Sequence, residues 1–84
     1  MVQAEASLYP LRTTDLGPAL GRFLDSLGKH DVAILPGPMS SRISGHLVEV
    51  FSALSHALTA VATEQQVVLI VKMSNACPAE REAL

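Results

Sequence analysis

Residues 32–45 read VAILPGPMSSRISG, and two short strands are predicted within them. The apolar run at 32–35 lies between Asp31 and the tripeptide Pro36-Gly37-Pro38, which is typical of a strand followed by a turn. Residues 40–44 fit the second strand of a hairpin. Because they are less apolar than 32–35, we expect them to be less buried.

The residues before this hairpin predict one strand and one helix. In residues 2–8, small or apolar side chains alternate with polar ones at a period of two, which is typical of a half-buried strand, and Pro10 ends it. This alternation places Glu5, Ser7 and Tyr9 on the outward face. Hydroxyl and carboxylate oxygens follow that could cap a helix, from Thr13, Thr14 and Asp15. Apolar residues then recur at helical spacing until Gly28, namely Leu16, Leu20, Phe23, Leu24 and Leu27.

The residues after the hairpin predict a second helix and a last strand. The helix is expected from Gly45 to about Glu64, with an apolar stripe of Leu47, Val50, Phe51, Leu54, Leu58 and Val61. Residues 66–73 contain an unbroken apolar run at 67–71. Such a run is typical of a central strand that is covered on both faces.

The predicted order is therefore β, α, β, β, α, β. With right-handed crossovers, both helices lie on one face of a four-stranded antiparallel sheet, which is the ferredoxin-like α+β sandwich. We expect one domain over residues 1–78 and a short C-terminal tail over 79–84. The other face of the sheet needs cover, which a second subunit in a homodimer or homotetramer would supply.

Composition excludes several classes of partner. The net charge of −2 and the six scattered basic residues argue against nucleic acid binding. No apolar run approaches the roughly 20 residues of a membrane span, and residues 1–11 lack the pattern of a signal peptide. The single cysteine, Cys77, has no internal disulfide partner, which fits a reducing compartment. We therefore expect a cytoplasmic protein.

Signatures of catalysis are absent from the sequence. It contains no GxSxG, P-loop, GxGxxG, HExxH or paired CxxC motif, so we expect no enzyme and no metal site. His30, His46 and His56 lack the spacing of metal ligands and are interpreted as ordinary surface or packed histidines. Cys77 is interpreted as a small, at least half-buried residue, since no neighbouring base is evident.

Three segments carry a resemblance to a known family: SLYPL at 7–11, GPMSSRISG at 37–45 and SNACP at 74–78. Together they resemble the YkoF-like family of thiamine- and hydroxymethylpyrimidine-binding proteins and, more distantly, the thiamine-binding domain family. The resemblance implies a ferredoxin-like domain that oligomerises through its sheet and holds a thiamine-type ligand near the sheet and a helix. The better-known members carry two such domains in tandem, and a homodimer of this chain could take the place of that pair.

The chain departs from the family pattern at two positions. His46 stands where the family often has an acidic residue, just after the glycine that precedes the second helix. This change affects helix capping or the charge balance of a ligand. Ser41 stands where a threonine is common, and it keeps the hydroxyl group.

The residues in these segments suit such a ligand chemically. An aminopyrimidine needs a group that both donates and accepts hydrogen bonds, which Asn75 provides, with hydroxyls around it. Ser7, Ser40, Ser41 and Ser74 are the candidate hydroxyls. A thiazolium cation favours an aromatic face or a polarisable sulfur, from Tyr9 or Met39, and a carboxylate, from Glu5 or Glu49.

Each of these residues also has a purely structural interpretation. Tyr9 could lie at the rim of an oligomer interface, Met39 could fill a gap in the core, and Glu49 could be a solvated helix residue. Arg42 would be structural or would contact the phosphate of a phosphorylated ligand.

The sequence thus predicts binding of thiamine or its hydroxymethylpyrimidine moiety without catalysis and without a further cofactor, in vitamin uptake, salvage or buffering. The alternative is an oligomerisation or regulatory module whose sheet face binds a protein. An enzyme of the same pathway would need a perturbed acid, base or thiol, and none is evident.

Overall fold

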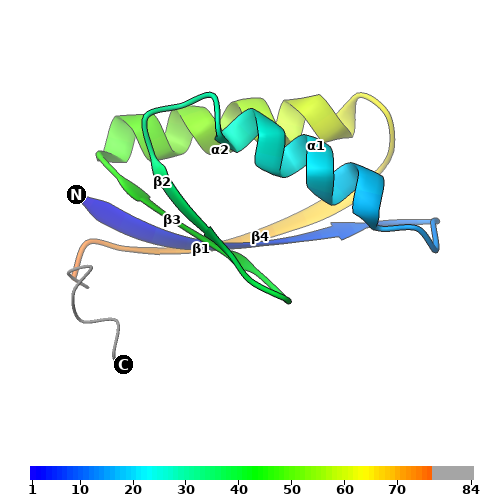
Figure 1. Ribbon diagram of the computed structural model, residues 1–84, viewed down its shortest axis with the longest axis horizontal. Helices are drawn as coiled ribbons and strands as arrows, with labels where there is room; N and C mark the ends of the chain where they lie inside the picture. The colour runs from blue at the N-terminus through cyan, green and yellow to red at the C-terminus, as the bar shows by residue number, and fades with distance from the viewer. Residues whose placement is uncertain (77–84) are drawn as a thin grey trace.

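The computed structural model of the chain describes residues 1–76. Six elements follow one another: β1 (Val2–Pro10), α1 (Gly17–Leu27), β2 (Ala33–Pro36), β3 (Ser41–Gly45), α2 (Leu47–Ala62) and β4 (Val67–Ser74) (Figure 1). The predicted βαββαβ order is confirmed. The predicted boundary near residue 78, Cys77 and the tail 79–84 lie outside the described residues.

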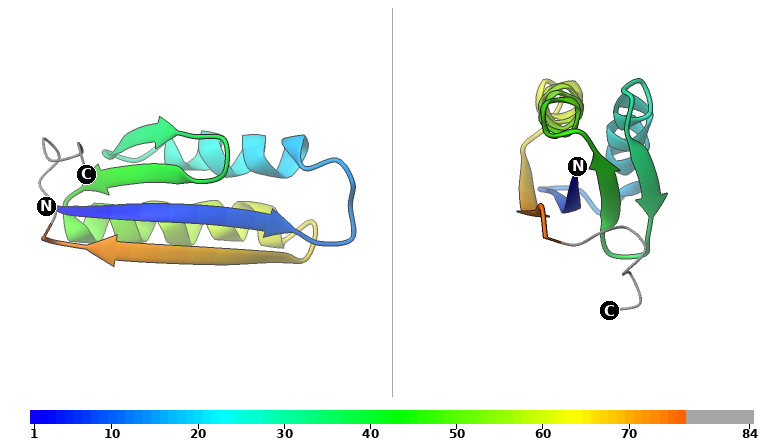
Figure 2. Two further views of the ribbon diagram at one scale, coloured as in Figure 1. Left: turned by 90° about the horizontal axis from the view of Figure 1, so that it is seen from below. Right: turned by 90° about the vertical axis from the view of Figure 1, so that its left-hand side faces the viewer.

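The four strands form one antiparallel sheet in the order β2-β3-β1-β4. β1 is central: it pairs with β3 from Val2↔Gly45 to Ala6↔Ser41, and with β4 from Gln3↔Ser74 to Pro10↔Val67. Both helices lie on the same face of this sheet (Figure 2). The ferredoxin-like sandwich predicted from the sequence is therefore confirmed.

Two predictions about the strands were wrong. β4 is not central but forms an edge of the sheet, and Val68 and Ile70 are 43% and 51% exposed. Its residues are apolar on both faces although only the inner face is covered by helices within the chain. β3 is more buried than β2, because β2 is the other edge while β3 lies between two strands and buries Ile43 completely.

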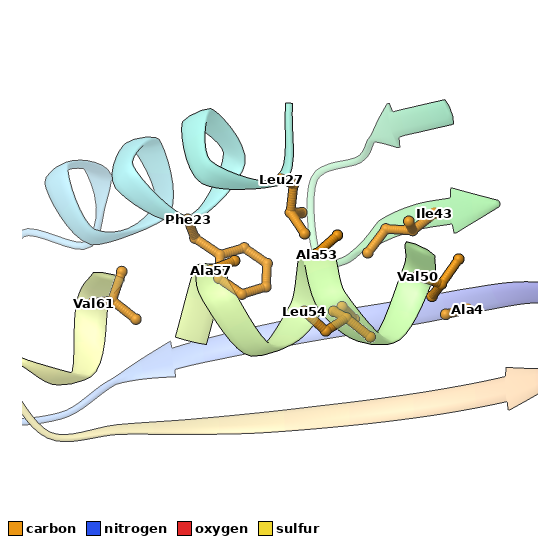
Figure 3. Close-up of a cluster of buried hydrophobic side chains, with 10 residues drawn as sticks. Ala4, Phe23, Leu27, Ile43, Val50, Ala53, Leu54, Ala57 and Val61 are labelled. Atoms are coloured by element: carbon orange, nitrogen blue, oxygen red, sulfur yellow. The ribbon is translucent and has the colours of Figure 1, made fainter. Parts of the chain in front are cut away.

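The core lies between the sheet and the helices (Figure 3). Phe23 and Leu27 reach into it from α1, and Ile43 reaches into it from β3. The remaining residues of this cluster come from β1 and α2, and several are alanines: Ala4, Ala6, Val50, Ala53, Leu54, Ala57 and Val61. The small side chains allow the helix backbones to approach the sheet closely, which maximises dispersion contacts in a small core.

The helices bury somewhat different faces from those predicted. α2 buries Ala53 and Ala57, whereas Leu47 and Phe51 of the predicted stripe are 49% and 57% exposed. Val50, Leu54 and Val61 lie on the helix face that packs against the core. Leu47 and Phe51 lie at the side of this face and are therefore only partly covered. Neither of the helices within residues 1–76 has the length and hydrophobicity that a membrane span needs.

The start of α1 also differs from the prediction. Leu16 is the N-cap residue, and no side chain caps the helix. Asp15 Oδ1 accepts a hydrogen bond from the Gly17 N–H at 3.3 Å, and Thr13 Oγ1 accepts one from the Asp15 N–H at 3.1 Å. Two of the three predicted capping residues, Thr13 and Asp15, therefore order the loop that leads into the helix. Leu16 and Leu20 are 46% and 38% exposed, although they belong to the predicted apolar stripe.

Candidate functional site

A cavity of about 290 Å³ lies where α1, the end of β1 and the β2–β3 turn meet. We call it the hairpin pocket. Its lining is mainly apolar and includes no Asp, Glu, Lys, Arg, His or Cys; it consists of Ala6, Leu8, Tyr9, Leu16, Leu20, Phe23, Leu24, Gly37, Pro38, Met39, Ser40 and Ser41. Leu16 and Leu20, which the core leaves exposed, thus form part of a concave surface.

The β2–β3 turn owes its shape to Gly37. A Cβ atom at this position would lie 2.8 Å from the carbonyl oxygen of Ser40, closer than real Cβ contacts allow. The adjacent prolines fix the backbone on either side of the glycine. The turn therefore holds Met39 and Ser40 beside the end of β1, where they complete the wall of the pocket.

The sheet register determines which serine faces the helices. Ser41 pairs with Ala6, and directly opposite residues share a face of the sheet. Because Ala6 is buried under the helices, the side chain of Ser41 lies on the helix side with it. Ser40, the preceding residue, bonds to a carboxylate on the opposite face. The pocket thus combines one inward hydroxyl group with Tyr9 and Met39 at its rim, 49% and 86% exposed.

Glu5 lies on the open sheet face between two cations. It pairs with Arg42 of β3 and with Lys72 of β4. The Ser40 hydroxyl donates to Glu5 Oε2 at 2.9 Å, and Lys72 Nζ lies 3.3 Å from Oε1. The Ser40 hydrogen bond, followed by the contact with Lys72 and the field of Arg42, lowers the pKa of Glu5 below its ordinary value. Its charge is therefore already balanced by the protein itself.

The structure brings together only part of the predicted site. Tyr9, Met39, Ser40 and Ser41 line the hairpin pocket. Ser7 and Tyr9 both belong to the alternating set on the open face, where Ser7 pairs with Ile70 and Tyr9 with Val68. Tyr9, at the end of the strand, reaches the rim of the pocket, whereas Ser7 does not line it.

The other three predicted residues lie near the opposite end of the sheet. Ser74 pairs with Gln3, and Asn75 follows it. Glu49 lies in the first turn of α2, just beyond Gly45, which pairs with Val2. At about 3.3 Å per residue, Gln3 and Tyr9 are roughly 20 Å apart along β1. Within one chain, these residues are therefore not neighbours of the hairpin pocket.

The sequence matches the YKOF-related family over residues 1–80. The chain belongs to this family. The resemblance to the YkoF-like proteins, inferred from residues 7–11, 37–45 and 74–78, is thereby confirmed. A search of curated proteins finds no match.

Solved structures similar to this YKOF-related chain share its fold. A hypothetical protein from Methanocaldococcus jannaschii has a TM-score of 0.83 at 24% identity, over 88% of this chain and 78% of the other. A protein from Streptococcus pneumoniae has a TM-score of 0.83 at 18% identity, over 98% and 92%. A Thermotoga maritima protein, described as a "putative thiamine biosynthesis/salvage protein", has a TM-score of 0.77 at 14% identity, over 87% and 81%.

Sequence reasoning missed the apolar walls of the pocket in this YKOF-related chain. Leu16 and Leu20 were predicted only as part of the apolar stripe of the first helix, because their spacing is helical. Helical spacing alone does not distinguish leucines that line a cavity from leucines that fill a core, so the sequence offers no separate signal for these walls.

The histidines and Arg42 lie outside the pocket. His46 is the N-cap residue of α2 and makes no side-chain capping bond, and Arg42 is exposed on β3. His30 and His56 contact each other with ring nitrogens 3.0 Å apart. The sequence did not predict this contact, because the two residues are 26 positions apart.

Proposed function

We propose that this chain binds the hydroxymethylpyrimidine moiety of thiamine, or thiamine itself, in the hairpin pocket and performs no reaction on it. Membership of the YKOF-related family supports this proposal, as does the fold shared with the Thermotoga maritima protein described in connection with thiamine. The observation that carries it is the pocket, which gathers four of the predicted residues, Tyr9, Met39, Ser40 and Ser41.

The size and lining of the pocket suit a small aromatic ring. Its volume of about 290 Å³ is near the lower end of the roughly 300–1,000 Å³ usual for ligand pockets. Leu8, Leu16 and Leu20 offer apolar surface to the faces of a ring. The Ser41 hydroxyl can donate a hydrogen bond to a ring nitrogen or accept one from the amino group.

The charge of the pocket favours the pyrimidine over the complete vitamin. None of its lining residues carries a carboxylate. Glu5, the nearest predicted acid, lies on the other face of the sheet and is paired with Lys72. A thiazolium cation would therefore depend on the Met39 sulfur and on Tyr9 at the rim of the pocket, whereas the neutral pyrimidine needs no counter-charge.

The proposed role is binding in uptake, salvage or buffering of the vitamin, in the cytoplasm. Tyr9 is the one lining residue with a titratable side chain, so the pocket offers no acid–base pair for catalysis. We further propose that two or four copies assemble through the open sheet face, since Val68 and Ile70 of β4 expose apolar side chains there.

Calorimetric titration tests the proposed site. Hydroxymethylpyrimidine, thiamine, thiamine phosphates and an unrelated vitamin are titrated into the protein and into two variants. Ser41→Ala removes the inward hydroxyl and should weaken pyrimidine binding about tenfold, the worth of one hydrogen bond. Asn75→Ala, at the far end of the sheet, should leave the affinity unchanged.

The reverse result would contradict this placement. If Asn75→Ala abolished binding while Ser41→Ala had no effect, the ligand would lie at the other end of the sheet or between two copies. No binding of any thiamine derivative at millimolar concentration would favour the alternative function, a module that binds a protein through its open sheet face. The exposed side chains of Tyr9, Val68 and Ile70 are the observation that supports this alternative.

A further inference from the structure

Two histidines far apart in the sequence meet on the helix layer, away from the hairpin pocket. His56 Nδ1 lies 3.0 Å from His30 Nε2, and the ring centroids are 4.9 Å apart with the planes tilted by 37°. The contact lies at the surface and joins the segment between α1 and β2 to α2. Both facing atoms are ring nitrogens, which bind transition metals when they carry no proton.

Both histidines have well-defined backbones. The His30 N–H donates to the Leu27 carbonyl at 3.1 Å, and the His30 carbonyl accepts from the Val32 N–H at 2.9 Å. His56 lies in the interior of α2, next to the buried Ala57. The two imidazoles are therefore presented from fixed positions and meet without rearrangement of the chain.

The separation of the nitrogens matches that of two ligands on one metal ion. Nitrogens that are each about 2.0–2.1 Å from an ion lie about 2.9 Å apart at a right angle and about 3.4 Å apart at the tetrahedral angle. The observed 3.0 Å falls within this range. A small rotation of each ring would direct both lone pairs toward a shared ion instead of toward each other.

We propose that His30 and His56 form a two-imidazole site for a divalent first-row transition ion such as Zn²⁺, Ni²⁺ or Cu²⁺. Imidazole suits these ions, whereas Mg²⁺ and Ca²⁺ need oxygen ligands. Within residues 1–76, no third His, Cys, Asp or Glu joins the pair, so water or another molecule completes the coordination. Binding requires one ring to move its proton to its distal nitrogen, so two neutral rings bind the ion without net proton release.

The bound ion would fasten the α1–β2 segment to α2. In the metal-free protein, a single N–H···N hydrogen bond can form between the two neutral rings. A metal ion replaces it with two coordinate bonds and stabilises the folded chain through linkage, because the unfolded chain does not hold the two histidines together.

Thermal unfolding with added ions tests this proposal. The Cys77→Ser variant serves as the background, since it removes the only thiol of the sequence. We expect Ni²⁺ or Zn²⁺ to raise the midpoint saturably, by about 10 °C or more at 100 times the dissociation constant, while Mg²⁺ has no effect. His30→Gln and His56→Gln should each abolish this rise, and His46→Gln, at the exposed N-cap residue of α2, should retain it.

Two results would overturn the proposal. One is the absence of any rise with millimolar Ni²⁺, Zn²⁺ and Cu²⁺. The other is a rise that persists in His30→Gln or His56→Gln, which would assign the ion to other ligands. Because both histidines lie at the surface, the variants are expected to fold, and their midpoints without metal provide the check.

Discussion

Glu5 shows how a single carboxylate depends on the register of the sheet. Arg42 and Lys72 stand on either side of it, and Ser40 donates to it from the hairpin. All these contacts favour the ionised form, so the pKa of Glu5 is lowered in the folded chain. The unfolded chain then binds the proton at a higher pH than the folded chain. The stabilising contribution is therefore complete above the ordinary glutamate pKa and is lost as the pH falls through the lowered one.

Removing the Ser40 hydroxyl should change this titration. In Ser40→Ala, we expect the pKa of Glu5 to rise toward its ordinary value, because the hydrogen bond to Ser40 is the largest cause of its lowering. Titration of the side-chain carboxyl signals by NMR measures the change. Ser44→Ala, which removes a hydroxyl from the open face of the sheet in β3, is the matched control and should leave the pKa of Glu5 unchanged. An unchanged Glu5 pKa in Ser40→Ala would contradict the assigned cause.

For single residues, the sequence predicted which face of the sheet a side chain occupies but not which side chains it contacts. The alternation in residues 2–8 correctly assigned Glu5 to the outward face, because a period of two is a local property of a strand. That Arg42 and Lys72 flank it depends on how distant strands align. The separation of Asn75 and Tyr9 was implied by the predicted antiparallel sheet, because both residues lie at the C-terminal ends of strands that run in opposite directions.

Helices α1 and α2 each carry one of the two phenylalanines of the chain, in opposite environments. Phe23 of α1 is 2% exposed and belongs to the core, whereas Phe51 of α2 is 57% exposed. The sequence assigned both to apolar stripes, because hydrophobic spacing alone does not show where the buried face of a helix ends. The alanines of α2, Ala53 and Ala57, take the place against the core that the larger side chains were expected to fill.

This difference predicts unequal effects of truncation. Phe23→Ala should lower the free energy of unfolding by about 3–5 kcal/mol, since it removes a buried ring and leaves a cavity. Phe51→Ala should change it by no more than about 0.5 kcal/mol, as is usual for surface positions. Urea denaturation of both variants measures these values. A large loss in Phe51→Ala would indicate that another molecule covers this side of α2.

For the whole molecule, the main feature is a sheet with helices on one face only. The sequence predicted this two-layer arrangement correctly, because the order of elements and right-handed crossovers leave few alternatives. It misplaced β4 because an apolar run on both faces has two explanations: burial in the centre of a sheet, or burial at an edge beneath a second subunit. Position in the sheet depends on all four strands together.

The proposed assembly through the open sheet face can be tested with a substitution that introduces one charged side chain. We expect the protein to sediment as a dimer or tetramer at micromolar concentration. Ile70→Lys, which places a charge on the apolar part of β4, should shift it to the monomer. Val48→Lys, at a position of α2 that is 73% exposed on the helix side, should leave the assembly unchanged. A monomer mass for the unaltered protein would contradict the assembly.

The central position of β1 has a consequence for how the chain reaches its native state. Of the four strands described, β1 is synthesised first and its partner β4 last, and the pair Gln3↔Ser74 joins nearly the two ends of the described chain. A nascent chain that ends before β4 leaves one side of β1 without hydrogen-bond partners. Because pairings between distant segments slow folding, we expect the sheet to close only after translation of β4, with the helix and hairpin contacts forming earlier.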